Sequence, residues 1–163
     1  MSTVKESFPA LATAITITLN SLASSGTVGR ASTAVDNSTN LDDDALVMVT
    51  LSQSASAVAN DKAIYVYAYG SYDGSTYPEG ITGSDASYTI LGAAGALTTA
   101  LRVIGVIPAV ASNTNSWGPF AVSPAFGGIL PVKWGIVVLN FGGQTLAGSG
   151  NSAAFTRVQY TVA

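Results

Sequence analysis

The sequence predicts an all-β protein: an antiparallel β-sandwich of jelly-roll type, with about eight strands and an extended N-terminal arm. Three observations predict this fold. Apolar residues alternate with Thr, Ser or Ala along short segments, which is the period of a strand with one buried face. Gly, Pro, Asn and Asp gather between those segments, as they do in turns. No segment of helical period separates them, which argues against a parallel α/β sheet.

The strand pattern recurs along the whole chain. It begins in Thr13 to Leu19, where Ile15, Ile17 and Leu19 alternate with other residues, chiefly Thr. The further predicted strands are Ala45 to Leu51, Ala63 to Tyr69, Ala86 to Leu91, Ala100 to Ile107, Phe120 to Ser123, Val132 to Asn140 and Ala153 to Val162. Strands of this number, joined by a few long connections, suit a jelly roll best among antiparallel folds.

The chain is long enough for one domain with its own core, since it has 163 residues of which 48% are apolar. Residues 1–12 have no strand period and are predicted to form an N-terminal arm. Residues 13–163 form the predicted single domain. Within it, residues 21–44 read as a long loop rich in Ser, Thr, Ala and Gly, too long for an economical connection. We expect the arm and this loop to serve attachment.

Composition excludes several classes of function. The chain has no His and no Cys, so thiol chemistry, redox chemistry and His-based catalysis are ruled out, and we expect neither an enzyme nor a cofactor. Its six Lys and Arg residues are dispersed, which argues against nucleic-acid binding. No apolar run approaches the ~20 residues of a membrane span. Only 9% of residues are charged, against about 25% in ordinary domains, so we expect copies or partners to cover much of the surface.

Two acidic groups could carry chemistry. Asp42, Asp43 and Asp44, with Asp36 upstream, could hold a hard cation such as Ca²⁺, but they lack the alternating spacing and central Gly of a calcium loop. Asp73, Glu79 and Asp85 could include an acid/base pair, which requires two facing carboxyl groups. The simpler interpretation of both groups is turn residues. Lys62 is the one lysine that could act as a base, and a solvated loop cation is the simpler interpretation.

Aromatic residues offer candidates for contact. On the segment Ile64 to Tyr69, the residues Tyr65, Tyr67 and Tyr69 share one face of the predicted strand. That face either packs inside the chain, lies against a neighbouring subunit or forms a platform for sugars. Trp134 is predicted to be core, whereas Trp117 lies in a turn-rich stretch and could be exposed. Arg30 could pair with an acidic group of a partner, or internally with Asp36 or with Asp42 to Asp44.

Three segments together resemble small head-associated virion proteins of tailed bacteriophages: Thr27 to Leu46, Tyr65 to Gly74, and Ala125 to Asn140. The resemblance implies a capsid decoration (cement) protein, made in the host cytoplasm, that binds the capsid exterior across neighbouring major capsid subunits. It also implies a homodimer or homotrimer and supplies no catalytic residue. From the residues themselves we expect neither a cofactor nor a metal.

The candidate interface residues are Arg30, Asp36, Tyr65, Tyr67, Tyr69 and Trp117. The alternative function is a glycan- or receptor-binding β-sandwich of a phage tail or head fibre, suggested by the turn Ser71 to Ser75.

Overall fold

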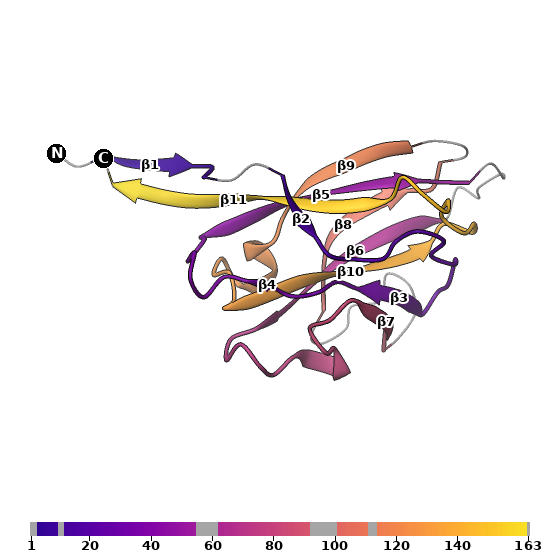
Figure 1. Cartoon of the computed structure of the whole chain (residues 1–163), viewed down its shortest axis with the longest axis horizontal. Helices are drawn as coiled ribbons and strands as arrows, with labels where there is room; N and C mark the ends of the chain where they lie inside the picture. Colours follow the sequence, from indigo (N-terminus) through magenta and orange to yellow (C-terminus); the bar gives the residue numbers. More distant parts are fainter. Residues whose placement is uncertain (1–2, 10–11, 55–61, 92–100, 111–113, 163) are drawn as a thin grey trace.

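The computed structural model describes residues 3–9, 12–54, 62–91, 101–110 and 114–162, and within them the chain forms two antiparallel β-sheets, as the sequence predicts (Figure 1). The strands are β1 (Val4–Ser7), β2 (Thr13–Ile15), β3 (Val28–Ala31), β4 (Val35–Asp36), β5 (Asp44–Ser52), β6 (Ala63–Ser71), β7 (Ala86–Thr89), β8 (Arg102–Pro108), β9 (Thr114–Ala121), β10 (Lys133–Phe141) and β11 (Ser152–Val162). The only helical segments in the described residues are two short 3-10 turns, η1 (Pro78–Gly80) and η2 (Ser123–Phe126).

Each sheet combines strands from both halves of the chain. The five-stranded sheet has the order β1-β11-β5-β9, with β2 also paired to β11. The six-stranded sheet has the order β7-β3-β10-β6-β8, with β4 also paired to β10. Since β1 and β2 adjoin the last strand β11, the two ends of the chain meet in one sheet, as Figure 1 shows.

The main core lies between the two sheets and follows from strand alternation. On β5 the odd-numbered residues are buried and the even-numbered residues are half-buried, as expected for a strand with one face on the core. Val47, Val49 and Leu51 of β5 belong to the same cluster as Ile136 and Val138 of β10. Trp134 of β10 is 1% exposed, and its ring meets the ring of Phe155 of β11 edge-on at 5.1 Å, joining the two sheets.

A second cluster covers the outer face of the six-stranded sheet. It contains Tyr67 and Tyr69 of β6, together with Ile81, Tyr88 and Leu101 from the segments that follow. The hydroxyl of Tyr69 donates a 2.7 Å hydrogen bond to the carbonyl of Ser32. Burial on both faces explains why β10 is buried at every position between its two half-buried ends.

The predicted N-terminal arm is not supported, because Val4–Ser7 forms β1 and pairs with β11. Its residues are almost all exposed, so no apolar alternation marked this strand in the sequence. The predicted loop at 21–44 likewise contains the short strands β3 and β4. At Gly29 of β3, a Cβ would lie 2.6 Å from the carbonyl oxygen of Val138, so the close approach of β3 to β10 requires glycine there.

Two predicted strands had wrong boundaries. The segment predicted as Phe120 to Ser123 is the end of a longer strand, β9, while Ser123 opens η2. Gly118 and Pro119 predicted a connection between strands, but both lie within β9. They are tolerated there because β9 is an edge strand and because its pairing with β5 shifts register between Val47 and Val49. The first predicted strand, Thr13 to Leu19, ends at Ile15 because the chain then crosses toward the six-stranded sheet.

Candidate functional site

The most distinctive surface feature is a two-stranded ribbon made by the two ends of the chain. Residues Val4–Ser7 of β1 pair with residues 159–162 of β11, from Val4 opposite Val162 to Ser7 opposite Gln159. The pairing of β11 with β5 stops at Val158, opposite Asp44. These last residues of β11 therefore extend beyond the sandwich with β1 alone beside them, and Figure 1 shows the resulting projection. We call it the terminal ribbon.

One face of the terminal ribbon is open to solvent and carries three large apolar side chains beside Glu6, which lies opposite Tyr160. Directly opposite residues of an antiparallel pair share a face, so Val4 and Val162 lie together, with Tyr160 two residues along. Their exposed fractions are 65%, 74% and 61%. A two-stranded ribbon is marginally stable in water on its own, and among the described residues no third strand lies beside these residue pairs.

Hydrogen bonds attach the loops at the same end of the sandwich to the ribbon. The carboxylate of Asp43 accepts a 2.8 Å bond from the backbone N–H of Tyr160, and the side-chain amide of Gln159 donates at 2.8 Å to the carbonyl of Asn40. The backbone N–H of Asn37 donates at 2.8 Å to the carbonyl of Val132, just before β10 begins. The ribbon, the loop at 37–43 and the start of β10 therefore form one continuous end.

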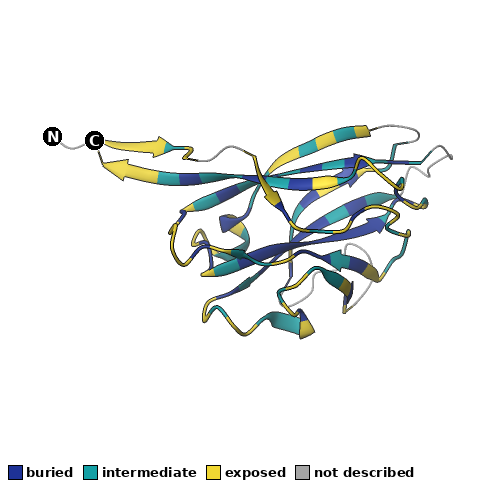
Figure 2. Cartoon of the chain, viewed as in Figure 1, coloured by how far each residue is buried: buried dark blue, intermediate teal, exposed yellow. Residues whose placement is uncertain are grey.

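Exposed large apolar side chains are concentrated at this end. We call their set the ribbon end: Val4, Phe8, Leu41, Tyr72, Ile129, Val132, Tyr160 and Val162. Among the described residues, the other exposed large apolar side chains are Val28, Leu91 and Val106. Figure 2 shows the exposed residues along the ribbon and at the adjacent loops. Single exposed apolar residues are ordinary, but a gathering at one end indicates an interaction surface.

Carboxylates border the ribbon end. Asp36, Asp43 and Asp73 are exposed there. Hydrogen bonds from Ser38 lower the pKa of Asp36. Hydrogen bonds from Thr76 first, and then from Ser75 and Ser71, hold the pKa of Asp73 well below its usual range. Both carboxylates therefore stay ionised near neutral pH. Lys133 lies opposite Asp36 and Lys5 is exposed on β1, so charges of both signs border the apolar side chains of the ribbon end.

Two of the six predicted interface residues are excluded by burial. Tyr67 and Tyr69 are 0% exposed within the single chain, where the second cluster covers them, so their predicted contact with a partner is wrong. Burial raises the pKa of Tyr69 to about 12. Tyr65 is half-buried, with its ring 6.3 Å from that of Tyr67. The tyrosine face of β6 is a contact surface, as predicted, but the side chains that cover Tyr67 and Tyr69 belong to the same chain.

Arg30 has an internal partner that the sequence did not reveal. Its Nε donates to the carboxylate of Asp85, and its Nη2 donates at 3.2 Å to the carbonyl of the same residue. Neither Asp36 nor the Asp42 to Asp44 group pairs with it, so both internal pairings predicted for Arg30 were wrong. The register of β3 with β7 explains the contact, because it places Ser87 opposite Arg30 and Asp85 just before β7.

This ion pair predicts a pH dependence of stability. Burial alone would raise the pKa of Asp85, but hydrogen bonds from Arg30 and Thr18 outweigh burial and lower it. An unfolded Asp titrates near about pH 3.9. Because the folded pKa is lower, the carboxylate stabilises the fold above that pH, and the contribution is lost as pH falls through the folded pKa. In urea titrations, Asp85→Asn should flatten the loss of unfolding free energy between about pH 5 and about pH 2. Glu6→Gln is the control, and equal slopes for wild type and Asp85→Asn would contradict the assignment.

Of the two remaining candidate interface residues, Trp117 packs against the core and Asp36 lies beside the ribbon end. Trp117 lies on β9 and is half-buried against the core, with its indole N–H buried and without a partner in the described residues. Asp36, at the end of β4, is the one predicted interface residue that borders the ribbon end. Of the two Trp predictions, core placement of Trp134 is confirmed.

The acidic groups serve the fold. Asp42 pairs with Arg157, and Asp44 accepts backbone hydrogen bonds from Ala45, Val122 and Ser123. No group of three potential metal ligands occurs among the residues that the structure describes. Glu79 accepts a 2.7 Å bond from the hydroxyl of Tyr88, while Asp73 and Asp85 hold the contacts given above. Lys62 lies 3.9 Å from the centre of the Phe141 ring.

Sequence reasoning missed the residues that make up the ribbon end. One signal was present: the predicted strand Ala153 to Val162 is longer than Ala45 to Leu51, the strand that turned out to be its partner. An overhang of this kind leaves side chains that the sandwich cannot cover.

Comparison with known proteins found no matching family model, no matching curated protein and no matching solved structure. Within the described part of the chain, no helix has the length and apolar character needed to cross a membrane.

Proposed function

We propose that this chain is a structural virion protein that decorates a phage capsid, with the ribbon end binding across neighbouring major capsid subunits. In this proposal the protein is not an enzyme, acts on the capsid exterior and associates as a homodimer or homotrimer. The choice of a phage capsid as the partner is based on the resemblance of residues 27–46, 65–74 and 125–140 to head-associated phage proteins.

The observation that carries the proposal is the concentration of exposed apolar side chains at the ribbon end. A projecting ribbon reaches beyond the body of its own subunit, and its edges carry backbone groups that can pair with a strand of a neighbour. Loops beside the ribbon add Leu41, Tyr72, Ile129 and Val132. Several modest contacts made together by one rigid body give strong retention on a repeating lattice.

Strand order supports the jelly-roll topology within this proposal. If β1 with β2 counts as the first strand, β3 with β4 as the second, and β7 is set aside, the principal strands number eight. The five-stranded sheet then has the order first, eighth, third, sixth, and the six-stranded sheet has the order second, seventh, fourth, fifth. Double-sheet jelly rolls occur in viral capsid and lectin domains. By analogy of fold alone, the topology is therefore compatible with both the decoration role and the alternative of glycan binding.

The turn that suggested glycan binding gives that alternative little support. One oxygen of Asp73 accepts hydrogen bonds from Ser71, Ser75 and Thr76, all within the turn itself. This arrangement is that of an Asp-stabilised turn and not of a carboxylate held ready for sugar hydroxyls.

Adding the purified chain to phage particles that lack it tests the proposal. After sedimentation through a cushion, we expect bound copies to saturate at a fixed ratio to the major capsid subunit, and electron microscopy should place them over the head. An unrelated β-sandwich protein of similar size is the control. Binding of only a few copies at the tail would contradict decoration and favour the receptor-binding alternative.

A further inference from the structure

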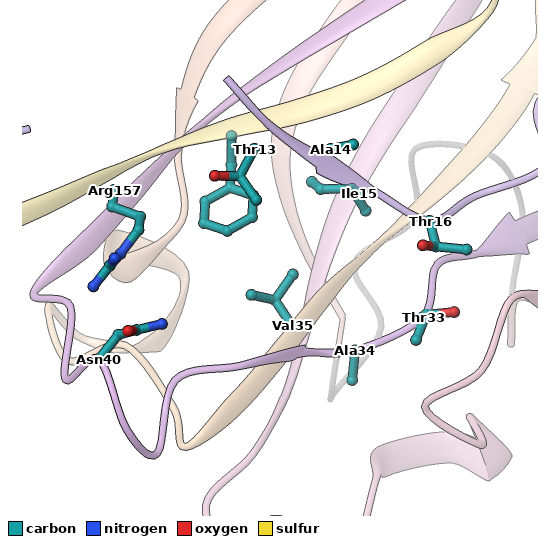
Figure 3. Close-up of a pocket in the computed structure, with 10 residues that line it drawn as sticks. Thr13, Ala14, Ile15, Thr16, Thr33, Ala34, Val35, Asn40 and Arg157 are labelled. Carbon is teal, nitrogen blue, oxygen red and sulfur yellow. The ribbon is translucent and has the colours of Figure 1, made fainter. Parts of the chain in front are cut away.

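A pocket of about 320 Å³ lies at one side of the sandwich, between β2 and the segment that leads into β4 (Figure 3). Thr13, Ile15 and Thr16 line it from one sheet, and Val35 lines it from the other. Phe155 and Arg157 of β11 complete the wall, with Asn40 beside Arg157. The volume is at the lower end of the range for small-molecule sites, about 300–1,000 Å³.

Arg157 is held in place by a buried carboxylate. Its Nε donates to both oxygens of Asp42, at 2.9 and 3.0 Å, and the side chain of Asp42 is only 5% exposed. Gln159 donates a further 2.9 Å bond to Asp42. The two Nη atoms of Arg157 donate to no acceptor among the described residues, while the side chain retains 19% exposure. A fixed guanidinium therefore presents unused donors at the pocket.

The rest of the pocket combines polar groups with an apolar wall. The side-chain amide of Asn40 and the hydroxyls of Thr13 and Thr16 make no hydrogen bond within the described residues. Val35 is half-buried and supplies accessible apolar surface, while Ile15 and Phe155, each 5% exposed, form the apolar floor of the pocket. This mixture suits a compact ligand with an apolar face and several hydroxyl groups at its edge.

Charge favours a neutral ligand over an anion. Asp42 already neutralises Arg157 at hydrogen-bonding distance. The loop that carries Asn40 also carries the exposed carboxylates of Asp36 and Asp43. A carboxylate or phosphate would meet this negative charge, whereas a hydroxyl or ring oxygen can accept from Arg157 without that repulsion.

We propose that this pocket binds one neutral sugar unit of a glycan. The apolar face of the sugar ring packs on Val35 and on the small exposed part of the Phe155 ring, and its hydroxyl groups bond with Arg157, Asn40 and Thr13. The pocket adjoins the ribbon end, because Asn40 lies on the loop at 37–43, but it uses side chains other than the exposed apolar residues proposed for decoration. Sugar binding by the isolated chain therefore tests this site separately from particle binding.

Ligand-detected NMR, together with ¹H–¹⁵N spectra of the labelled full chain, tests the site. Glucose, galactose, mannose and N-acetylglucosamine are the neutral probes, at millimolar concentration, and glucuronate and acetate are the anionic probes. We expect at least one neutral sugar to bind and to shift the side-chain signals of Arg157 and Asn40. A glycan array then extends the same comparison to longer chains.

Two variants identify the pocket. Arg157→Lys keeps a cation beside Asp42 but removes the paired Nη donors, and Asn40→Ala removes an exposed amide; each should weaken sugar binding about tenfold. Arg30→Lys, at the other half-buried arginine, is the matched control and should bind as wild type. Melting curves establish that each variant is folded. Absence of binding by every neutral probe, tighter binding of an anionic probe, or unchanged affinity in both pocket variants would overturn the proposal.

Discussion

Trp134→Ala is expected to lower the free energy of unfolding by about 3–5 kcal/mol. Trp134 is 1% exposed and belongs to the core between the sheets, where it meets the ring of Phe155 from the opposite sheet. Removing its side chain leaves a cavity between two sheets that strand pairing holds in place, so the neighbouring side chains cannot collapse into it fully. Urea unfolding followed by circular dichroism measures the change.

Trp117→Phe is the contrasting variant. Trp117 is half-buried on an edge strand, and its buried N–H has no partner in the described residues. Phenylalanine removes that unsatisfied donor and keeps most of the apolar contact, so the change should stay within about 1 kcal/mol. If Trp134→Ala cost no more than Trp117→Phe, the assignment of Trp134 to the centre of the core would be incorrect.

Arg157→Ala is expected to destabilise the fold by about 2–4 kcal/mol, because it leaves the carboxylate of Asp42 buried without its cation. Among the described residues, Asp42 then keeps Gln159 as its one side-chain donor. The loop at 37–42 depends on the same residue, since the backbone of Asp42 exchanges two hydrogen bonds with the side chain of Asn37. Chemical unfolding of the variant measures the loss.

A double-mutant cycle separates the pair from other effects of the substitution. Asp42→Ala, Arg157→Ala and the double variant should show strong coupling, so that the double variant costs clearly less than the sum of the single variants. Additive costs would mean that the two side chains do not act as a pair.

The sequence predicted the fold class well because strand alternation is a local signal. In β5, β6, β10 and β11 the period of two is set by burial of one face, and the predicted ranges agree with the observed strands within one or two residues at each end. The strands β1, β3 and β4 were missed for a physical reason. They are short, rich in small or exposed residues, and depend on pairing with β11 or β10, which lie far away in the chain.

The candidate interface could be predicted only in part. The tyrosine face of β6 was correctly identified as a contact surface, yet sequence alone does not tell whether a partner covers it or side chains of the same chain do, here Ile81, Tyr88 and Leu101. Val4, Tyr160 and Val162 become notable only through the register that places them together beyond the end of β5. Their exposure is a property of strand lengths in the assembled sheet.

Binding of two matched valine variants to particles that lack this protein tests the central claim most directly. Val162→Ser changes an exposed valine of the ribbon end, and Val106→Ser changes an exposed valine of β8 outside it. Bound copies are counted after sedimentation across a range of added protein. We predict that Val162→Ser binds at least about tenfold more weakly than wild type, while Val106→Ser binds as wild type. Equal binding by both variants, with both folded, would contradict attachment through the ribbon end.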